Sequence, residues 1–110
     1  MQLPLESTDP LSALVGTNCR RHREELQLSQ SQLAAAVSSK GSARWTAATV
    51  SGLETGRRNL TLSELADLLE VLQVPLASLL KYRADEQDGY LRRRCDVLTQ
   101  PEWQGGTYGP

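Results

Sequence analysis

The sequence contains no phenylalanine, and aromatic residues make up only 5% of its 110 positions. Leu, Ala and Val supply most of the apolar side chains, a set that favours helices over a β-sandwich. No run of about 18 apolar residues is present, and the first residues lack the basic and then apolar pattern of a secretory signal. We therefore expect a small helical protein of the cytoplasm that has no membrane partner.

Histidine and cysteine are also scarce. His22 is the one histidine, and Cys19 and Cys95 stand far apart, so the clustered ligands of a zinc or iron–sulfur site are missing. No nucleophile beside a base, no paired carboxylates and no glycine-rich phosphate loop can be identified. We expect no metal, no cofactor and no enzymatic activity. Two isolated cysteines fit a reducing compartment, with Cys19 as a small buried residue.

The charge is distributed unevenly along the chain. The formal net charge is −1, which argues against a generally basic nucleic-acid binder. Residues 11–60 nevertheless carry seven basic and three acidic side chains, a net charge of +4, whereas residues 61–110 carry a net charge of −3. A basic half of this kind can bind phosphate on one face of a molecule that is nearly neutral overall.

Residues that start helices recur along the first 82 positions. Helices are expected to begin after Asp9, Ser29, Thr46 and Thr61, with a fifth after Val74-Pro75. Gln32 and Glu64 lie three residues after two of these caps and complete capping boxes. Apolar residues repeat at helical spacing within each segment, so the pattern predicts an all-α bundle of five helices.

The chain divides into four parts on this interpretation. Residues 1–9 are expected to form a flexible arm, and residues 10–82 the helical domain. Residues 83–98 contain an apolar stripe that allows a sixth, C-terminal helix. Residues 99–110, rich in Gly and Pro, are expected to be a disordered tail. Within the domain, residues 38–45 form a polar connector that is expected to be flexible.

The segment that follows this connector is the most informative one for function. Val50 and Leu53 are three residues apart, the spacing of one buried face of a short helix. Gly56 suits the left-handed turn that ends a helix, and Arg57 and Arg58 follow at once. A short helix with small outward side chains, closed by a glycine and two arginines, fits the major groove of a DNA duplex.

Together, these motifs resemble the lambda-repressor-like helix-turn-helix domains, the Cro or xenobiotic-response-element type. The matching positions are Arg23, LSQSQLA at 28–34, VSGLETGRR at 50–58 and the leucine-rich pattern at 62–75. The resemblance covers residues 11–82 and implies a five-helix DNA-binding domain. It further implies a structural ion pair between Arg23 and Glu54, which fixes the third helix against the first.

The resemblance also implies a set of residues that contact double-stranded DNA. Gln30, at the start of the second helix, would approach a phosphate, and the loop with Arg57 and Arg58 would track the backbone. Residues 46–55 would enter the major groove. The candidate groove-facing residues are Thr46, Ala47, Ala48, Thr49, Ser51 and Gly52. None of these is Arg, Gln or Asn, so the helix itself lacks the strongest bidentate contacts to bases.

The connector before this helix departs from the family pattern. Val50 follows Ala34 by 16 residues, whereas the usual spacing is roughly 10. A similar long connector, with Arg-Trp just before the third helix, occurs in BldD-type developmental regulators of actinobacteria. The inserted residues include Lys40 and Arg44, and Arg44 is a candidate for the base or phosphate contact that the helix lacks. A solvated loop explains Lys40 and Arg44 equally well.

The leading hypothesis is a sequence-specific transcription regulator, associated with the nucleoid of a bacterium or acting for a phage. A homodimer is expected, because one short helix reads few bases and two half-sites multiply the affinity. The alternative is an antitoxin, or another protein-interaction module with the same fold. In that case the acidic C-terminal segment would bind a protein partner.

Overall fold

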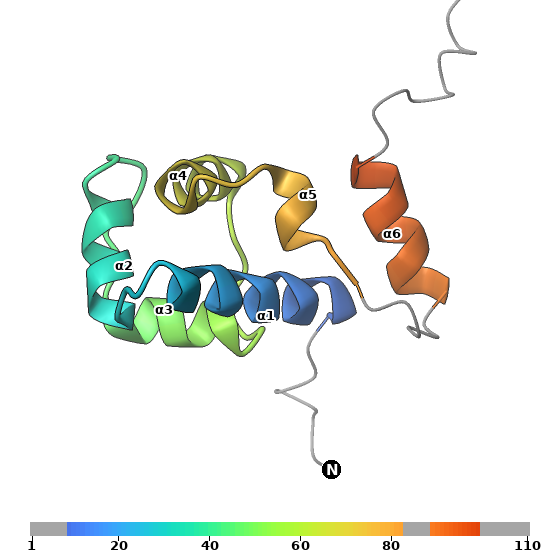
Figure 1. Ribbon diagram of the computed structural model, residues 1–110, viewed down its shortest axis with the longest axis horizontal. Coiled ribbons are helices and arrows are strands. Elements are labelled where there is room, and N and C mark those ends of the chain that lie inside the picture. Colours follow the sequence, from blue (N-terminus) through green and yellow to red (C-terminus); the bar gives the residue numbers. More distant parts are fainter. Residues whose placement is uncertain (1–8, 83–88, 100–110) are drawn as a thin grey trace, which may run out of the picture.

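The computed structural model describes residues 9–82 and 89–99, and every regular element in these two ranges is a helix (Figure 1). The helices are α1 (Pro10–Glu25), α2 (Gln30–Ser38), α3 (Ala47–Glu54), α4 (Leu62–Leu72), α5 (Leu76–Leu79) and α6 (Gly89–Thr99). The prediction of an all-α fold is confirmed. The expected arm and tail lie outside the described residues, except for Asp9 and Thr99.

Side-chain caps fix where the helices begin. The Asp9 carboxylate accepts a hydrogen bond from the Ser12 backbone N–H at 3.2 Å. Ser29, Thr46 and Thr61 each cap a helix in a reciprocal capping box. Each box satisfies two backbone donors that a helix N-terminus leaves free. The boxes at Ser29 and Thr61 were predicted; the one between Thr46 and Thr49 was not.

Helix α1 ends at Glu25. Gln27 adopts a left-handed conformation, with φ of 61°, and the N–H of Leu28 returns to the carbonyl of Arg23 at 3.1 Å. The chain therefore reverses tightly into α2 without the glycine that usually occupies such a position.

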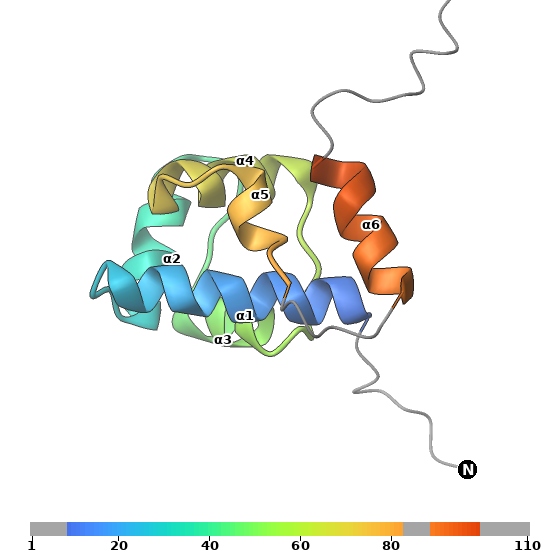
Figure 2. The same cartoon turned by 45° about the vertical axis from the view of Figure 1, so that its right-hand side comes forward.

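The main hydrophobic core lies between the first five helices. Leu33 and Val37 of α2, Val50 of α3 and Leu68 of α4 are fully buried in it, together with Cys19 of α1. The burial of Cys19 was predicted, and it raises the pKa of this thiol to about 12. Figure 2 shows α1 running across the bundle, with α3 along one side and α4 and α5 along the other.

Helix α6 packs on the same bundle through a second, smaller core. Leu91 and Cys95 of α6 are buried with Leu80, and Leu11 and Leu14 of α1 cover this cluster. Figure 1 shows α6 beside α5 and the start of α1. No helix within the described ranges is both long enough and apolar enough to cross a membrane.

Candidate nucleic-acid interface

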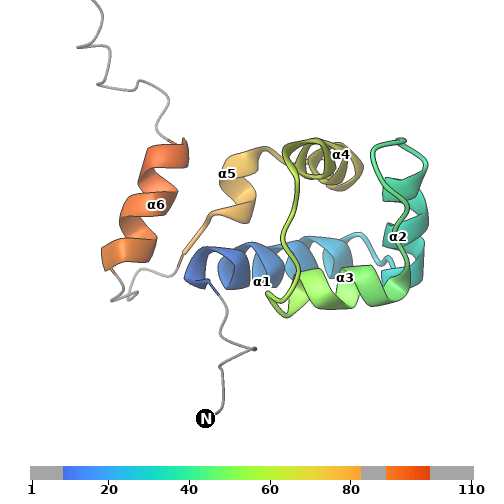
Figure 3. The ribbon, with the colours of Figure 1, turned by 180° about the vertical axis from the view of Figure 1, so that it is seen from behind.

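Helix α3 lies at an outer face of the bundle, alongside α1 (Figure 3). Val50 and Leu53 anchor it, since their side chains are 0% and 2% exposed. The opposite face carries Ala48, Ser51 and Thr55, all exposed and spaced three and four residues apart. Only small side chains therefore separate the α3 backbone from solvent. Thr55 was predicted only as part of the range 46–55, and its spacing from Ser51 could have identified it.

The remaining residues of the predicted set are less open. Thr46 is exposed, whereas Ala47, Thr49 and Gly52 are half-buried. The hydroxyl of Thr49 accepts a hydrogen bond from the Thr46 N–H at 3.1 Å. Thr49 thus has a role in starting α3 that its place in the sequence did not reveal. The hydroxyl of Thr55 likewise donates to the Ser51 carbonyl at 3.0 Å, which leaves Ser51 with the freest hydroxyl of the stripe.

A charged cluster holds α3 against α1 and α2. Arg23 donates from Nε to Glu54 Oε2 at 2.6 Å and from Nη2 to Oε1 at 3.1 Å. Its Nη1 donates to the Leu28 carbonyl at 2.7 Å. The side chains of Arg23 and Glu54 are only 10% and 4% exposed, and the hydrogen bond to Glu54 raises the pKa of Arg23. The ion pair implied by the resemblance is therefore present as a fork between two helices.

Gln30 joins the same cluster. Its Nε2 donates to Glu54 Oε1 at 3.1 Å, and its side chain is half-buried. The resemblance implied a phosphate contact for this amide, but the structure directs its nitrogen toward a carboxylate of α3. Gln30 thus connects α2 to α3 within the helix-turn-helix.

A glycine in α1 permits the close approach of α1 and α3. A Cβ atom on Gly16 would lie 2.2 Å from the Leu53 carbonyl oxygen and 2.9 Å from that of Glu54. Real Cβ atoms do not come this close to a backbone oxygen, so no other residue fits without moving the helices apart. The orientation of α3 therefore depends on a backbone contact as well as on side chains.

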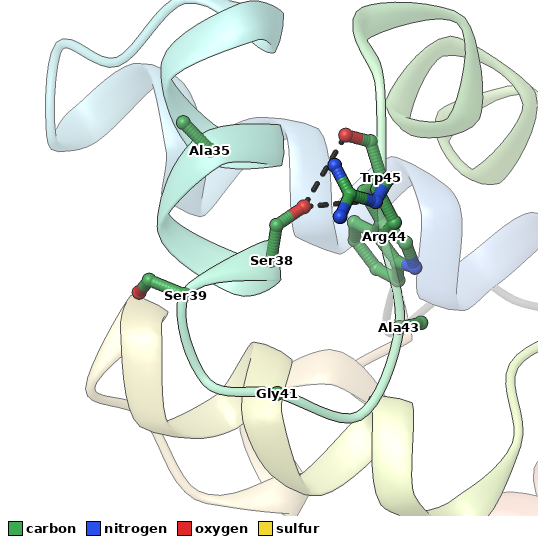
Figure 4. Close-up of a pocket in the computed structure, with 7 residues that line it drawn as sticks. All are labelled: Ala35, Ser38, Ser39, Gly41, Ala43, Arg44 and Trp45. Atoms are coloured by element: carbon green, nitrogen blue, oxygen red, sulfur yellow. Dashed lines mark hydrogen bonds between the residues drawn. The ribbon is translucent and has the colours of Figure 1, made fainter.

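The connector at 38–45 is pinned at several points, contrary to the prediction of a flexible segment. Ser38 Oγ accepts from the Trp45 N–H at 2.7 Å and donates to the Trp45 carbonyl at 3.3 Å, closing the loop (Figure 4). The Ser42 N–H donates to Asp67 at 3.2 Å, and Lys40 lies 3.3 Å from Glu70. These contacts with α4 fix a segment that its polar composition alone suggests is loose.

Trp45 fastens the end of the connector to the core. The residue is 4% exposed, the burial of a core anchor rather than of a base-stacking side chain, and its Nε1 donates to Glu64 Oε2 at 3.2 Å. Glu64 is itself buried. The position of α3 is therefore also set from α4, through the residue that precedes its N-cap.

Arg58, which the resemblance places near phosphates, has a partner within the domain. It donates to both carboxylate oxygens of Glu64, at 3.2 and 2.8 Å, and its guanidinium lies 5.3 Å from the centre of the Trp45 ring. The hydrogen bonds from Arg58 lower the pKa of Glu64 to about 2, with help from the Thr61 N–H and the Trp45 ring. The fork matches carboxylate geometry, so Arg58 supports the domain from within.

Two arginines remain exposed at the ends of α3. Arg44 precedes the Thr46 cap by two residues, and Arg57 follows Thr55 by two residues. The side chain of neither arginine forms a hydrogen bond or ion pair with a described residue. Arg44 lies over a hollow of about 720 Å³ between the connector and the end of α2 (Figure 4). Gly56, with φ of 79°, turns the chain so that Arg57 leaves the helix end.

No three His, Cys, Asp or Glu side chains converge within residues 9–82 and 89–99. What the arrangement presents instead is a narrow stripe of small side chains, with an arginine at each end. Of the predicted contact residues, Arg44, Thr46, Ala48, Ser51 and Arg57 share this exposed surface. The remaining charged or amide-bearing candidates are Gln30, Lys40 and Arg58. Each of them contacts a carboxylate of the same chain.

Residues 15–80 match the family model of a helix-turn-helix domain, which covers more than half of the chain. The protein therefore belongs to the helix-turn-helix domain family, a class of DNA-binding proteins. No curated protein and no solved structure shows significant similarity to the chain.

Proposed function

We propose that this protein is a sequence-specific transcription regulator of the lambda-repressor-like type, which places α3 in the major groove of double-stranded DNA. The observation that carries the proposal is the exposed face of α3, where Ala48, Ser51 and Thr55 lie between Arg44 and Arg57. Small side chains let the helix approach base edges, and the methyl groups of Ala and Thr can contact thymine. The two arginines supply the charge that phosphates require.

The pinned connector supports a specific role for Arg44. The contacts of Ser38, Ser42 and Trp45 hold the loop on either side of Arg44. A guanidinium carried by a fixed segment loses less conformational entropy on binding than one on a mobile loop. Arg44 is thus suited to a defined base or phosphate contact beside the N-terminus of α3, in the manner of the BldD-type regulators that the connector resembles.

A homodimer follows from the size of the reading surface. Helix α3 has eight residues, which reach few base pairs, and specific binding at cellular salt generally requires more contacts than one such helix makes. Two copies on half-sites about one helical turn apart would supply them. We expect the bound sequences to be palindromic for this reason.

The test is selection of bound duplexes from a random library, compared between the wild-type protein, Arg44→Ala and Lys40→Ala. A palindromic consensus with half-sites roughly 10 base pairs apart would support both DNA reading and dimerisation. If Arg44 contacts a base, its variant loses preference at one position in each half-site, while Lys40→Ala, whose partner is Glu70, leaves the consensus intact. Recovery of no consensus by the wild type would overturn the proposal.

A further inference from the structure

A second surface, separate from the exposed face of α3, carries several exposed apolar side chains. Among the described residues five large apolar side chains are exposed, and four of them line two adjoining hollows: Leu62, Tyr90, Val97 and Leu98. The fifth, Leu26, lies elsewhere. Contiguous apolar patches on soluble proteins generally mark sites of interaction.

The two hollows form one surface, here called the apolar groove. The larger, about 530 Å³, lies between α1, α4, α5 and the stretch after α3; the smaller, about 430 Å³, lies against α6. Leu11 and Leu98 line both. Figure 3 shows α6 standing across from the stretch at 55–61 that joins α3 to α4.

The charged side chains that line the apolar groove are all basic. Its only charged lining residues are Arg58 in the larger hollow and Arg93 and Arg94 in the smaller one, and no carboxylate of the described chain lines either. Glu64 neutralises Arg58. Arg94 donates to the neutral Tyr90 hydroxyl at 2.7 Å, so its charge remains uncompensated there. The nearby Asp96 accepts from Tyr82. The positive charge therefore concentrates at the α6 end.

We propose that the apolar groove binds an amphipathic helix of another protein, whose leucine-like residues enter the two hollows and whose acidic residues face Arg93 and Arg94. A helix laid in a groove anchors itself through residues spaced three, four and seven apart. The α6 helix, with 11 residues, spans roughly 16 Å, or three turns. The groove thus offers room for two or three such anchors.

A second copy of this chain is a poorer occupant. A twofold contact places the same patch on both sides, which would bring the arginines of α6 toward one another with no carboxylate on the lining to offset them. Like charges that face one another across an interface disfavour association. Duplex DNA is also a poor match, because the lining is dominated by leucine.

The experiment uses designed peptides of roughly 18 residues, with leucines at helical spacing and glutamates at the remaining positions. Binding to the full chain is measured by fluorescence anisotropy. A matched peptide has lysine in place of glutamate, and a scrambled acidic peptide has the same composition without the spacing. We expect the acidic amphipathic peptide to bind at least about tenfold more tightly than either control, and its affinity to fall with salt.

Variants of the chain locate the site. Leu98→Glu should lower the affinity for the acidic peptide by about tenfold. Leu26→Glu changes an exposed leucine outside the groove and should leave this affinity unchanged. Arg93→Glu should lower the affinity for the acidic peptide and raise the affinity for the lysine peptide. Thermal unfolding followed by circular dichroism verifies that each variant is folded.

Several outcomes would overturn the proposal. Equal binding of all three peptides, or no binding of the acidic one, removes the basis for an acidic partner helix. Self-association of the wild type that Leu98→Glu abolishes would assign the groove to a second copy. A loss of DNA affinity in Arg93→Glu as large as that in Arg57→Ala would assign these arginines to nucleic acid instead.

Discussion

Arg57 and Arg58 are neighbours in the chain, yet their side chains have different surroundings. Arg57 is exposed, whereas the side chain of Arg58 is 34% exposed and binds Glu64 through both carboxylate oxygens. Substituting each arginine in turn therefore separates an effect on DNA binding from an effect on the stability of the fold.

Arg57→Ala should weaken DNA binding and reduce the salt slope of log K by about 0.9 for each phosphate that the protein no longer neutralises. Its free energy of unfolding should change by less than about 0.5 kcal/mol. Arg58→Ala should lower that free energy by about 2 kcal/mol, since it leaves Glu64 buried without its main partner. Gel shifts over a salt series and urea unfolding measure the two effects. An unchanged salt slope in Arg57→Ala would contradict the phosphate contact.

Glu64 should make the stability of the domain dependent on acid. Its pKa is about 2 in the folded protein, below the ordinary 4.5, because of the hydrogen bonds from Arg58, Thr61 and Trp45. A lowered folded pKa stabilises the native state above the unfolded value, and this contribution is lost as the pH falls from about 5 toward 2. The glutamine of Glu64→Gln does not titrate, so the variant lacks this pH-dependent contribution.

The difference in unfolding free energy between wild type and Glu64→Gln should therefore shrink from about 3 kcal/mol at pH 6 toward zero near pH 2. Urea unfolding at several pH values provides the measurement. The other carboxylates titrate in both proteins, so the comparison isolates Glu64. A difference that stays constant with pH would show that Glu64 acts through its shape alone.

The sequence predicts local roles at this scale better than distant partners. Ser29, Thr61 and Gly56 act within their own turns, and the structure places them as expected. The partner of Arg58 was not predicted, because Glu64 also has a local role, as the capping-box residue of α4. Nothing in the spacing of residues 58 and 64 reveals that the Glu64 carboxylate both caps α4 and binds Arg58.

Among the elements, α3 is positioned by contacts that come from three directions. Glu54 ties it to α1 and α2, Trp45 ties its start to α4, and Gly16 lets α1 approach its backbone. The Gly16 contact is the least adjustable of these, because backbone meets backbone.

Gly16→Ala should reduce the free energy of unfolding by about 2–3 kcal/mol, since its Cβ would lie 2.2 Å from the Leu53 carbonyl oxygen. Gly52→Ala is the matched control within α3. Its Cβ would meet only Arg58 Cβ, at 3.5 Å, so the higher helix propensity of alanine should stabilise the protein by up to about 1 kcal/mol. Chemical denaturation compares the two. Equal effects would contradict the close packing of α1 on α3.

The connector shows why an inserted segment is hard to interpret from sequence. Its Ser, Gly and Lys residues are typical of a loose loop, yet the structure gives it contacts with α4. The residues that pin it, Asp67 and Glu70 on α4, are about 25–30 positions away. Acidic residues are common on the outer face of a helix, so their presence in the sequence does not indicate that they contact the connector. Trp45, the bulky apolar residue at the end of the insertion, is the one residue of the segment whose type points to an anchored loop.

At the scale of the whole molecule, α6 extends the domain beyond the helix-turn-helix match at 15–80. The apolar stripe within 83–98 allowed a sixth helix, and the structure has one over Gly89–Thr99, while residues 83–88 lie outside the described ranges. The stripe did not reveal which side chains are buried: Leu91 and Cys95 are inward, whereas Tyr90, Val97 and Leu98 are exposed. The bundle and α6 share Leu11 and Leu80, which suggests one cooperative unit.

Leu91→Ala tests that cooperativity. Leu91 is 5% exposed within the second core, so its truncation should lower the unfolding free energy of the entire domain by about 2–3 kcal/mol. Leu98→Ala, on the same helix but 50% exposed, should cost less than about 0.5 kcal/mol. Amide hydrogen exchange at α1 and α3 distinguishes global from local effects. If Leu91→Ala accelerates exchange in α6 alone, α6 unfolds independently of the DNA-binding bundle. Faster exchange of the most protected amides of α1 and α3 would instead show that weaker packing at α6 reaches α3.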